Sequence, residues 1–236
     1  MKIKKTYKKQ LFMFEKRNLR GKALADYKKT LVLNDLQTDI IIGSLLGDST
    51  MGLRKGVPLY SLKFEQSVKK QGYIFHLAEI FEKFCGSPPA RRWIDKKKTR
   101  EALWFRTYRH NSFAFFFNLF YVIEEDPVTG QPFSRKIVPL NISKFLNPRV
   151  VAYWFMDDGT FHRDSRSGAK QYYFSTQGFQ KSECQLLCDA LRTRFNIQTN
   201  VHKDGKYWRI YIRAQSNHLF LDLISPYIVD DLLYRL

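Results

Sequence analysis

The chain has 236 residues, of which 40 are Lys or Arg and 22 are Asp or Glu, so its formal net charge at pH 7 is +18. Hydrophobic residues make up 44% of the sequence, including 20 Phe and 13 Tyr, which excludes intrinsic disorder for most of the chain. No apolar stretch reaches the ~18 residues of a membrane-spanning helix. An odd count of three Cys argues against a disulfide framework and for a reducing compartment.

The positive charge predicts a polyanionic partner. A chain this basic repels itself when folded unless a polyanion binds, and nucleic acid is the commonest such partner. Contact with an anionic membrane surface is the alternative. Residues 1–30 contain 11 basic and two acidic residues, a net charge of 11 − 2 = +9. This segment could be an organellar transit peptide, but it is rich in Lys and nearly free of Ser, so we interpret it as a nucleic-acid-binding extension.

Hydrophobic periodicity and turn residues predict the elements in chain order. After the extension, we expect a helix over 37–48, a strand over 60–67, a helix over about 70–85, a charged hairpin over 90–109 and a Phe-rich helix over 111–123. A linker follows over 124–147, because this stretch contains Pro127, Gly130, Pro132 and Pro139. The second half repeats the order, with a helix over 148–158, a strand over 170–177, a helix over 181–195, a hairpin over 197–213 and a helix over 215–224.

The two halves match at one constant offset, so that a position in the first half has its equivalent 110 further along the chain. The apolar stripe Ile74, Leu77, Ala78, Phe81 and Cys85 maps onto Cys184, Leu187, Cys188, Leu191 and Phe195, and the same offset maps Phe64 onto Phe174 and Asp48 onto Asp158. One matched stripe would be weak evidence, but a helix, a strand and an acid that match together indicate a duplication. We therefore divide the chain into a basic extension (1–36), a first repeat (37–125), a linker (126–146) and a second repeat (147–236).

The opening helix of each repeat carries the strongest signal of function. Both helices are almost wholly apolar, and each ends in an acid, Asp48 or Asp158, followed by a small residue. A carboxylate at the negative end of a helix dipole is disfavoured by about 0.3–1 kcal/mol, and a bound divalent cation would reverse that penalty. Gly43 and Gly47 leave a flat face where a second helix could approach. If the two helices pack side by side, both acids emerge at one end.

Two other interpretations fit these acids less well. A lone Asp at a helix end is usually a solvated surface group, although two at equivalent positions argue against that. The stretch Phe155-Met156-Asp157-Asp158 also looks like the acid pair of reverse transcriptases. That pair lies in a strand hairpin of a much longer chain, whereas these acids end a helix that begins after Pro148.

Two apolar helices that end in acids, inside an αββαββα repeat of a basic chain, resemble the LAGLIDADG homing endonucleases of the single-chain, two-motif type. The resemblance covers about residues 37–236. It implies an α+β fold in which two pseudo-symmetric αββαββα repeats form a saddle of antiparallel sheets around two central packed helices. It also implies a monomer that cuts double-stranded DNA and leaves short 3′ overhangs, with an organellar origin in mitochondrion or chloroplast.

The resemblance places Asp48 and Asp158 at the metal-binding acid position of the family. We expect them to bind two or three Mg²⁺ ions, for which Mn²⁺ substitutes and Ca²⁺ binds without turnover. The resemblance also implies a basic residue near each scissile phosphate, and by segment order the candidates are Lys136 and Arg235. Arg235 stays protonated and cannot act as a base, so only an electrostatic or positioning role fits it. Gln66 and Gln177 end equivalent strands and could hold water beside the acids, although Gln177 lies one position beyond the exact equivalent of Gln66.

The strand segments alternate polar and apolar residues, as expected of sheets with one buried face. We expect their basic and aromatic residues to contact base edges or phosphates in the major groove. These residues are Lys63, Arg91, Lys96, Lys98, Arg100, Arg106 and Tyr108 in the first repeat, and Lys170, Lys203, Lys206, Arg209, Tyr211 and Arg213 in the second. Strands of about 8–9 residues span roughly 28 Å, or about eight base pairs. Two unequal halves therefore predict a non-palindromic site of about 16–20 base pairs.

The sequence favours site-specific hydrolysis of both DNA strands, but it is also compatible with two other functions. The same scaffold could be a maturase that binds structured intron RNA, or a catalytically silent DNA-binding protein.

Overall fold

The computed structural model describes residues 19–54, 57–165 and 168–236. Packing divides the chain into two compact units. The first comprises residues up to Thr38 together with Asp48–Phe115, and the second comprises Asp39–Gly47 together with Phe116–Leu236. The first 18 residues of the predicted basic extension lie outside the described residues.

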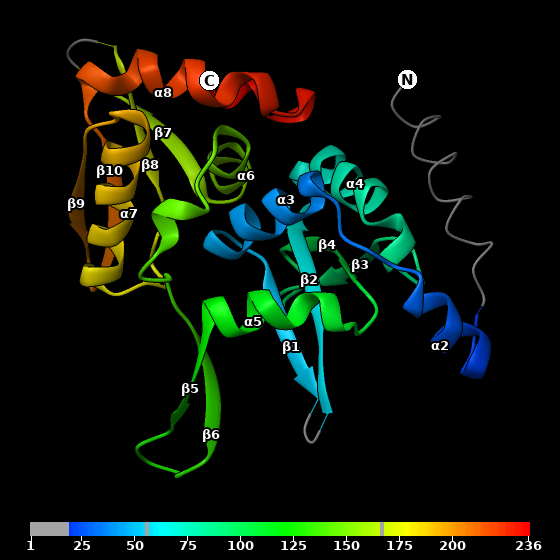
Figure 1. The fold of residues 1–236 in the computed structure, drawn as a ribbon. Helices are drawn as coiled ribbons and strands as arrows, with labels where there is room; N and C mark the ends of the chain where they lie inside the picture. The colour runs from blue at the N-terminus through cyan, green and yellow to red at the C-terminus, as the bar shows by residue number, and fades with distance from the viewer. Residues whose placement is uncertain (1–18, 55–56, 166–167) are drawn as a thin grey trace. The chain divides into compact units, whose positions relative to one another are not determined.

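The first unit contains one four-stranded antiparallel sheet (Figure 1). Its elements are α2 (Gly21–Lys29), the start of α3 (Asp35–Leu46), β1 (Thr50–Arg54), β2 (Val57–Ser67), α4 (Gln71–Ile80), β3 (Ala90–Trp93) and β4 (Glu101–Arg106). The strands lie in the order β1-β2-β4-β3. Phe64 anchors the core, because its ring centroid lies 5.1 Å from that of Phe81 after α4 and 4.8 Å from that of Phe105 in β4. These apolar contacts bury one face of the sheet.

The second unit repeats this arrangement with a second four-stranded sheet. Its elements are α5 (Ala114–Phe120, from Phe116 onward), β5 (Tyr121–Glu125), β6 (Pro132–Lys136), α6 (Pro148–Asp158), β7 (Gly159–Arg163), β8 (Lys170–Phe174), α7 (Lys181–Phe195), β9 (Thr199–Asp204), β10 (Tyr207–Ile212) and α8 (Asn217–Ile224). The strand order β7-β8-β10-β9 is the first order again. Trp154 of α6 stacks on Phe174, the repeat equivalent of Phe64, with ring centroids 3.8 Å apart.

The element order and sheet topology confirm the predicted α+β fold of two αββαββα repeats. The predicted helices over 148–158 and 181–195 have the observed bounds, and Asn147 and Asn196 explain one end of each. Asn147 accepts a hydrogen bond from the Val150 amide and caps the start of α6. Asn196 adopts a left-handed conformation, with φ of 56°, and ends α7.

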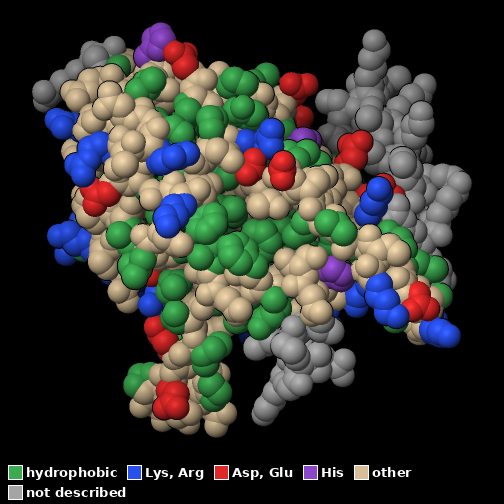
Figure 2. Space-filling view, in the orientation of Figure 1, with side chains coloured by type: hydrophobic (Ala, Val, Ile, Leu, Met, Phe, Trp, Pro, Cys, Tyr) green, Lys and Arg blue, Asp and Glu red, His purple; other side chains and the backbone are tan. Residues whose placement is uncertain are grey.

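The predicted Phe-rich helix over 111–123 was wrong at its end. Helical structure stops at Phe120, and β5 and β6 form a hairpin inside the segment predicted as a linker. The Asp126 side chain accepts hydrogen bonds from the amides of Val128 and Thr129 and so organises the turn. Some of the Pro and Gly residues that we interpreted as a linker therefore belong to a hairpin. This hairpin protrudes from its unit (Figure 1, Figure 2).

Other predicted bounds were too long. The helix predicted over 37–48 ends at Leu46, the helix predicted over 70–85 ends at Ile80, and the strand predicted over 170–177 ends at Phe174.

Across the described residues, no helix combines the length and the apolar character needed to cross a membrane.

Candidate active site and nucleic-acid interface

Within the second unit, the Asp39–Gly47 part of α3 packs along α6. Asp39 accepts hydrogen bonds from Asn147 and Arg149 at the start of α6. A Cβ added at Gly43 would lie 2.6 Å from the Val150 carbonyl oxygen, so the two backbones are in close contact. The predicted helix pair is therefore present.

The contacts of this pair join repeat-equivalent positions. Asp39 bonds to Arg149, Gly43 packs against Tyr153, and Gly47 packs against Asp157, and each of these pairs has the constant offset between the repeats. Asp157 is only 5% exposed and fills the space that a side chain at position 47 would need. Glycine at position 47 is therefore required by the close approach of the two helices.

Asp48 directly follows Gly47, and its carboxylate is exposed. Gln66 of β2 donates a hydrogen bond from Nε2 to Asp48 Oδ2 over 2.9 Å. A cavity of about 430 Å³ opens beside this pair, with Lys63, Glu65 and Lys70 among its lining residues. The acid thus lies at the end of a buried helix and is held by an amide donor within reach of solvent.

Asp158 is the last residue of α6 and is half-buried, and its carbonyl oxygen accepts a hydrogen bond from the Ser175 amide over 3.0 Å. Gln177 was predicted to end the strand beside it, but β8 ends at Phe174 and Gln177 lies in an exposed turn. The exact repeat equivalent of Gln66 is Thr176, which is buried and donates to the Trp208 carbonyl. The prediction that Gln177 ends a strand equivalent to that of Gln66 was therefore wrong.

Lys136 lies at the end of α3. Its Nζ donates a hydrogen bond to the Gly47 carbonyl oxygen over 2.6 Å and lies 5.9 Å from the centroid of the Phe179 ring. The carbonyls at a helix C-terminus lack partners within the helix and carry partial negative charge. An ammonium group in this position satisfies one carbonyl and stabilises the helix end one residue before Asp48.

Arg235 occupies the corresponding place on α6. Its Nη1 donates to the carbonyl oxygens of Gly159 over 2.7 Å and Met156 over 3.2 Å. The two predicted basic residues therefore each contact the C-terminal carbonyls of one acid-bearing helix. Each positive charge offsets negative charge at its helix end, and each hydrogen bond also stabilises that helix end.

The first sheet presents a charged face that its own core does not cover. Side chains alternate along a strand, so Leu62 and Phe64 enter the core while Lys63 and Glu65 point outward. Glu65 forms ion pairs with both Lys63 and Arg92. Burial opposes ionisation of Glu65, but the hydrogen bonds from Arg92 and Lys63 outweigh it and lower the pKa of the carboxyl.

On the same face, Lys63 and Arg106 lie 5.8 and 6.0 Å from the Trp104 ring. Arg91, which was predicted to contact DNA, points to the opposite face and pairs there with Glu101. Arg92, which was not predicted, is on the outer face. Alternation along β3 separates Arg92 from Arg91, but only the strand register places Arg92 on the same face as Lys63.

The remaining basic candidates of the first repeat lie in the loop between β3 and β4. Lys96, Lys98 and Arg100 are exposed there. Asp95 organises this loop by accepting hydrogen bonds from Thr99 and Arg100, which lower its pKa. Tyr108 lies beyond β4, where its ring packs edge-on against Tyr27 of α2 at 6.5 Å, so it is not part of the outer face of the sheet.

The outer face of the second sheet is aromatic as well as basic. Arg209 lies 4.6 Å from the Tyr173 ring, and Tyr211 packs between Tyr173 and His202 at 5.1 Å from each. Arg213 is exposed just after β10, and Lys206 lies in the turn before it, 5.2 Å from the Tyr207 ring. Arg209 and Tyr211 therefore share one surface.

Two candidates of the second repeat point to the helix side instead. Lys170 has the strand parity of the core residue Tyr172, and its ammonium donates to the Leu236 carbonyl and lies 4.6 Å from the Phe161 ring. Lys203 pairs in register with Trp208, on the side of the sheet that faces α7. Neither side chain therefore shares the outer face with Arg209 and Tyr211, because a shift of one residue reverses the side of a strand.

The residues around the acids fit a hard divalent cation. Asp48 and Asp158 offer carboxylate oxygens at solvent-accessible positions, which is the donor type that Mg²⁺ prefers. Among the described residues, no group of three or more His, Cys, Asp or Glu side chains could hold a metal ion. Any ion at these acids would keep water or substrate oxygens among its ligands.

A family model described as the LAGLIDADG DNA endonuclease family matches residues 38–220. The chain is 30% identical over 221 residues to the probable intron-encoded endonuclease 1 of Wickerhamomyces canadensis, covering 92% of this chain and 90% of that one. It is 28% identical over 205 residues to the cytochrome b mRNA maturase bI2 of Saccharomyces cerevisiae, covering 84% of this chain and 46% of the maturase.

Among solved structures, the chain is similar to the homing endonuclease I-WcaI bound to its DNA recognition sequence, with a TM-score of 0.80 and 28% identity. That alignment covers 94% of this chain and 96% of the other. The repeat topology, the helix pair and the match over residues 38–220 agree. The chain therefore belongs to the LAGLIDADG DNA endonuclease family.

Proposed function

We propose that the chain is a homing endonuclease that hydrolyses both strands of a long, non-palindromic DNA site and leaves short 3′ overhangs. The observation that carries the proposal is the α3–α6 helix pair. Its contacts join repeat-equivalent positions, and the last of them, Gly47 on Asp157, immediately precedes Asp48 and Asp158 in the chain. Two acids delivered in this way suit one reaction on each strand of a duplex.

Asp48 and Asp158 are the proposed ligands of Mg²⁺, of which two or three ions would be bound. Bound Mg²⁺ would neutralise charge on the attacking and leaving oxygens of the phosphodiester. Gln66 donates a hydrogen bond to the Asp48 carboxylate and would keep it oriented for an ion bound there. Mn²⁺ is expected to support cleavage, and Ca²⁺ is expected to support binding only.

Lys136 and Arg235 supply positive charge at the two helix ends. Their contacts with the Gly47 and Gly159 carbonyls offset the negative end of each helix dipole, which otherwise disfavours both the acids and an approaching phosphate. Lys136 can also exchange a proton with water or a leaving oxygen, whereas Arg235 acts only through charge and hydrogen bonds. The two strands would therefore be cut by unequal sites.

Each sheet would contact one half of the DNA site through its outer face. The first sheet offers Lys63, Arg92 and Arg106 around Trp104, and the second offers Arg209 with Tyr173 and Tyr211. Because these surfaces differ in chemistry, the two half-sites should differ in sequence. The expected site length stays about 16–20 base pairs.

One assay tests this function. The purified protein is incubated with the uninterrupted host-gene DNA, first with Mg²⁺ and then with Ca²⁺. We expect site-specific double-strand cleavage with Mg²⁺ only. Asp48→Asn and Asp158→Asn should each abolish double-strand cleavage, because each removes a metal-binding charge, while binding measured in Ca²⁺ persists. Cleavage that survives both substitutions would overturn the proposal.

A maturase is the second candidate, because the yeast relative of that name is 28% identical over 205 residues. In that case the protein would bind structured intron RNA through the same basic surfaces. Tight binding to intron RNA with no cleavage of any host-gene DNA would favour it. We also propose an organelle, mitochondrion or chloroplast, as the compartment, which the cytochrome b maturase among the relatives supports, and we propose that the protein acts there as a monomer.

A further inference from the structure

Glu183 is a buried carboxylate that the proposed chemistry does not use. It lies in the first turn of α7 and is 8% exposed. One of its oxygens, Oε2, accepts a hydrogen bond from the Gln180 amide over 2.7 Å at the start of the helix. This contact alone would make Glu183 a helix-capping residue.

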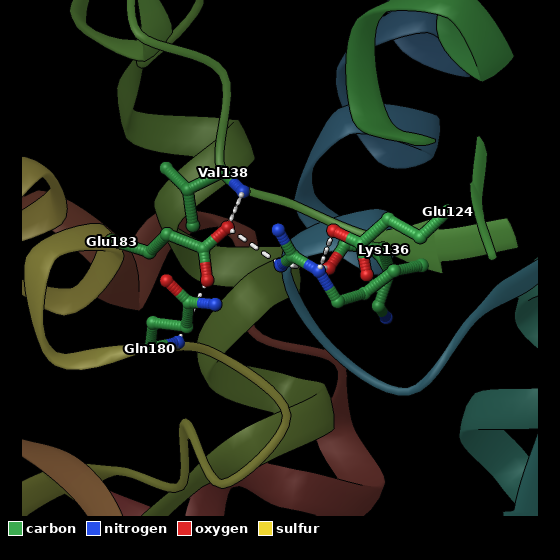
Figure 3. A network of polar contacts seen from close by, with 6 residues as sticks. Glu124, Lys136, Val138, Gln180 and Glu183 are labelled. Atoms are coloured by element: carbon green, nitrogen blue, oxygen red, sulfur yellow. Dashed lines mark hydrogen bonds and ion pairs between the residues drawn. The ribbon is translucent and has the colours of Figure 1, made fainter. Parts of the chain in front are cut away.

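The other oxygen, Oε1, binds the segment that carries Lys136. It accepts hydrogen bonds from Arg135 Nη1 over 3.2 Å and from the Val138 amide over 3.3 Å. These two donors lie on either side of Lys136 in the chain. Figure 3 shows the Glu183 carboxylate pointing toward Val138, with Gln180 on its other side.

Arg135 is fixed from a second direction. Its Nε donates to Glu124 of β5 over 2.8 Å. The hydrogen bonds to Glu124 and Glu183 raise the pKa of Arg135 further above its ordinary range. The guanidinium therefore links the β5–β6 hairpin to the start of α7, and the chain between Arg135 and Val138 is held at both ends.

Lys136 needs such support because its own side chain must reach the end of another element. Its ammonium lies 2.6 Å from the Gly47 carbonyl oxygen, one residue before Asp48. A flexible lysine on an unsupported segment would lose rotamer entropy to hold this position. A fixed backbone on either side reduces the remaining freedom to the side chain itself.

We propose that Glu183 and Arg135 are positioning residues, which set Lys136 at the end of α3 for DNA cleavage. This inference rests on the proposed function. Neither residue would touch DNA or metal. They would act by fixing residues 135–138, and a displacement of about 1 Å from the productive position can cost roughly 100-fold in rate.

The first measurement needs no cleavage. Acylation of Lys136 in metal-free protein is followed by mass spectrometry. We expect Glu183→Ala and Arg135→Ala each to raise the acylation rate of Lys136 severalfold, because the ammonium spends more time away from Gly47. Arg135→Ala leaves Glu183 bonded to Gln180, so it tests the inference even if Glu183→Ala fails to fold. Unchanged acylation in Arg135→Ala would overturn the inference.

The second measurement is single-turnover cleavage with Mg²⁺. Both variants should cut about 10- to 100-fold more slowly while binding in Ca²⁺ changes little. Added to Lys136→Met, Glu183→Ala should cause no further loss, because the residue it positions is already gone. Gln180→Ala is the matched control, since it alters the same helix end and leaves the bonds of Glu183 to Arg135 and Val138 in place. It should cut at the wild-type rate.

The outcomes separate the two claims. Wild-type protein that does not cut its target overturns the proposed function and this inference with it. Wild-type protein that cuts, with Lys136→Met impaired and Glu183→Ala and Arg135→Ala unimpaired, overturns the inference alone. An equal loss in Gln180→Ala would show that the start of α7, rather than the 135–138 segment, controls the rate, and would also overturn it.

Discussion

Glu65 is an acid on a surface proposed to bind a polyanion. Its carboxylate neutralises Lys63 and Arg92 on the outer face of the first sheet. Glu65→Ala should therefore release two cations for phosphate contact and strengthen binding to random-sequence DNA. Each additional phosphate contact steepens the dependence of log K on log salt by about 0.9. Binding isotherms at several salt concentrations measure that slope.

Glu101→Ala is the control for Glu65→Ala. It makes the same change in net charge but releases Arg91 on the opposite face of the same sheet. We expect it to leave the salt dependence close to that of the wild type. Equal slopes for the two variants would show that net charge alone, and not the outer face, governs the effect.

The sequence identifies the charged candidates, but it does not reliably predict on which face of its sheet each side chain lies. Composition identified the hairpins as basic. However, Arg91 and Lys203 lie on the side of their sheet that faces the helices, and Arg92, on the outer face, was not predicted. Strand alternation settles this only once the register is known. The contacts of Lys136 with Gly47 and of Arg235 with Gly159 join residues at least 76 positions apart, which no local pattern reveals.

The α3–α6 pair depends on the absence of a side chain at Gly43. A methyl group there would lie 2.6 Å from the Val150 carbonyl oxygen, a backbone atom that cannot rotate away. Overpacking of this kind costs about 1–3 kcal/mol, and the gain in helix propensity of about 1 kcal/mol offsets only part of it. Gly43→Ala should lower the urea midpoint for unfolding of the second unit.

Gly178→Ala provides the comparison. Gly178 lies in a turn where an added Cβ would meet nothing within 4 Å, and its φ is not positive. Its unfolding midpoint should match that of the wild type. A Gly43→Ala protein as stable as Gly178→Ala would mean that the two helices can separate at no cost, contrary to the packing described.

The order of elements was predictable because duplication makes each repeat evidence for the other. Phe64 and Phe174 occupy equivalent core positions, as the constant offset between the repeats predicted. The β5–β6 hairpin has no counterpart among the described residues of the other repeat, so that argument could not detect it. Its short strands are largely exposed and lack a clear apolar alternation, and its turn is fixed by a side-chain contact of Asp126.

The second unit should lose stability in alkaline solution. Burial raises the pKa of the Cys188 thiol from 9.0 to about 11 and that of Tyr153 from 10.0 to about 12. Between these values the unfolded chain releases a proton that the folded unit retains, so unfolding is favoured as pH rises. Each group can contribute up to about 1.4 kcal/mol per pH unit in its window. The loss should begin near pH 9 and increase above pH 10.

Tryptophan fluorescence can follow this unit separately. With Trp93 and Trp104 replaced by Phe, the remaining Trp154 and Trp208 both lie in the second unit. Urea midpoints measured from pH 7 to 11 should fall with pH, and Cys188→Ala should flatten the decline between pH 9 and 11. A decline as steep in Cys188→Ala as in the parent would exclude the thiol as its source.

The segment Asp39–Gly47 belongs by sequence to the first repeat and by packing to the second unit. A hybrid nuclease made by exchanging halves would naturally be divided between the two motifs. Here that junction would separate α6 from α3, whose Gly43 and Gly47 allow the close packing of the two helices. A transplanted half would have to carry residues 39–47 from the same parent, or be redesigned at Gly43 and Gly47, before any change of target sequence could be assessed.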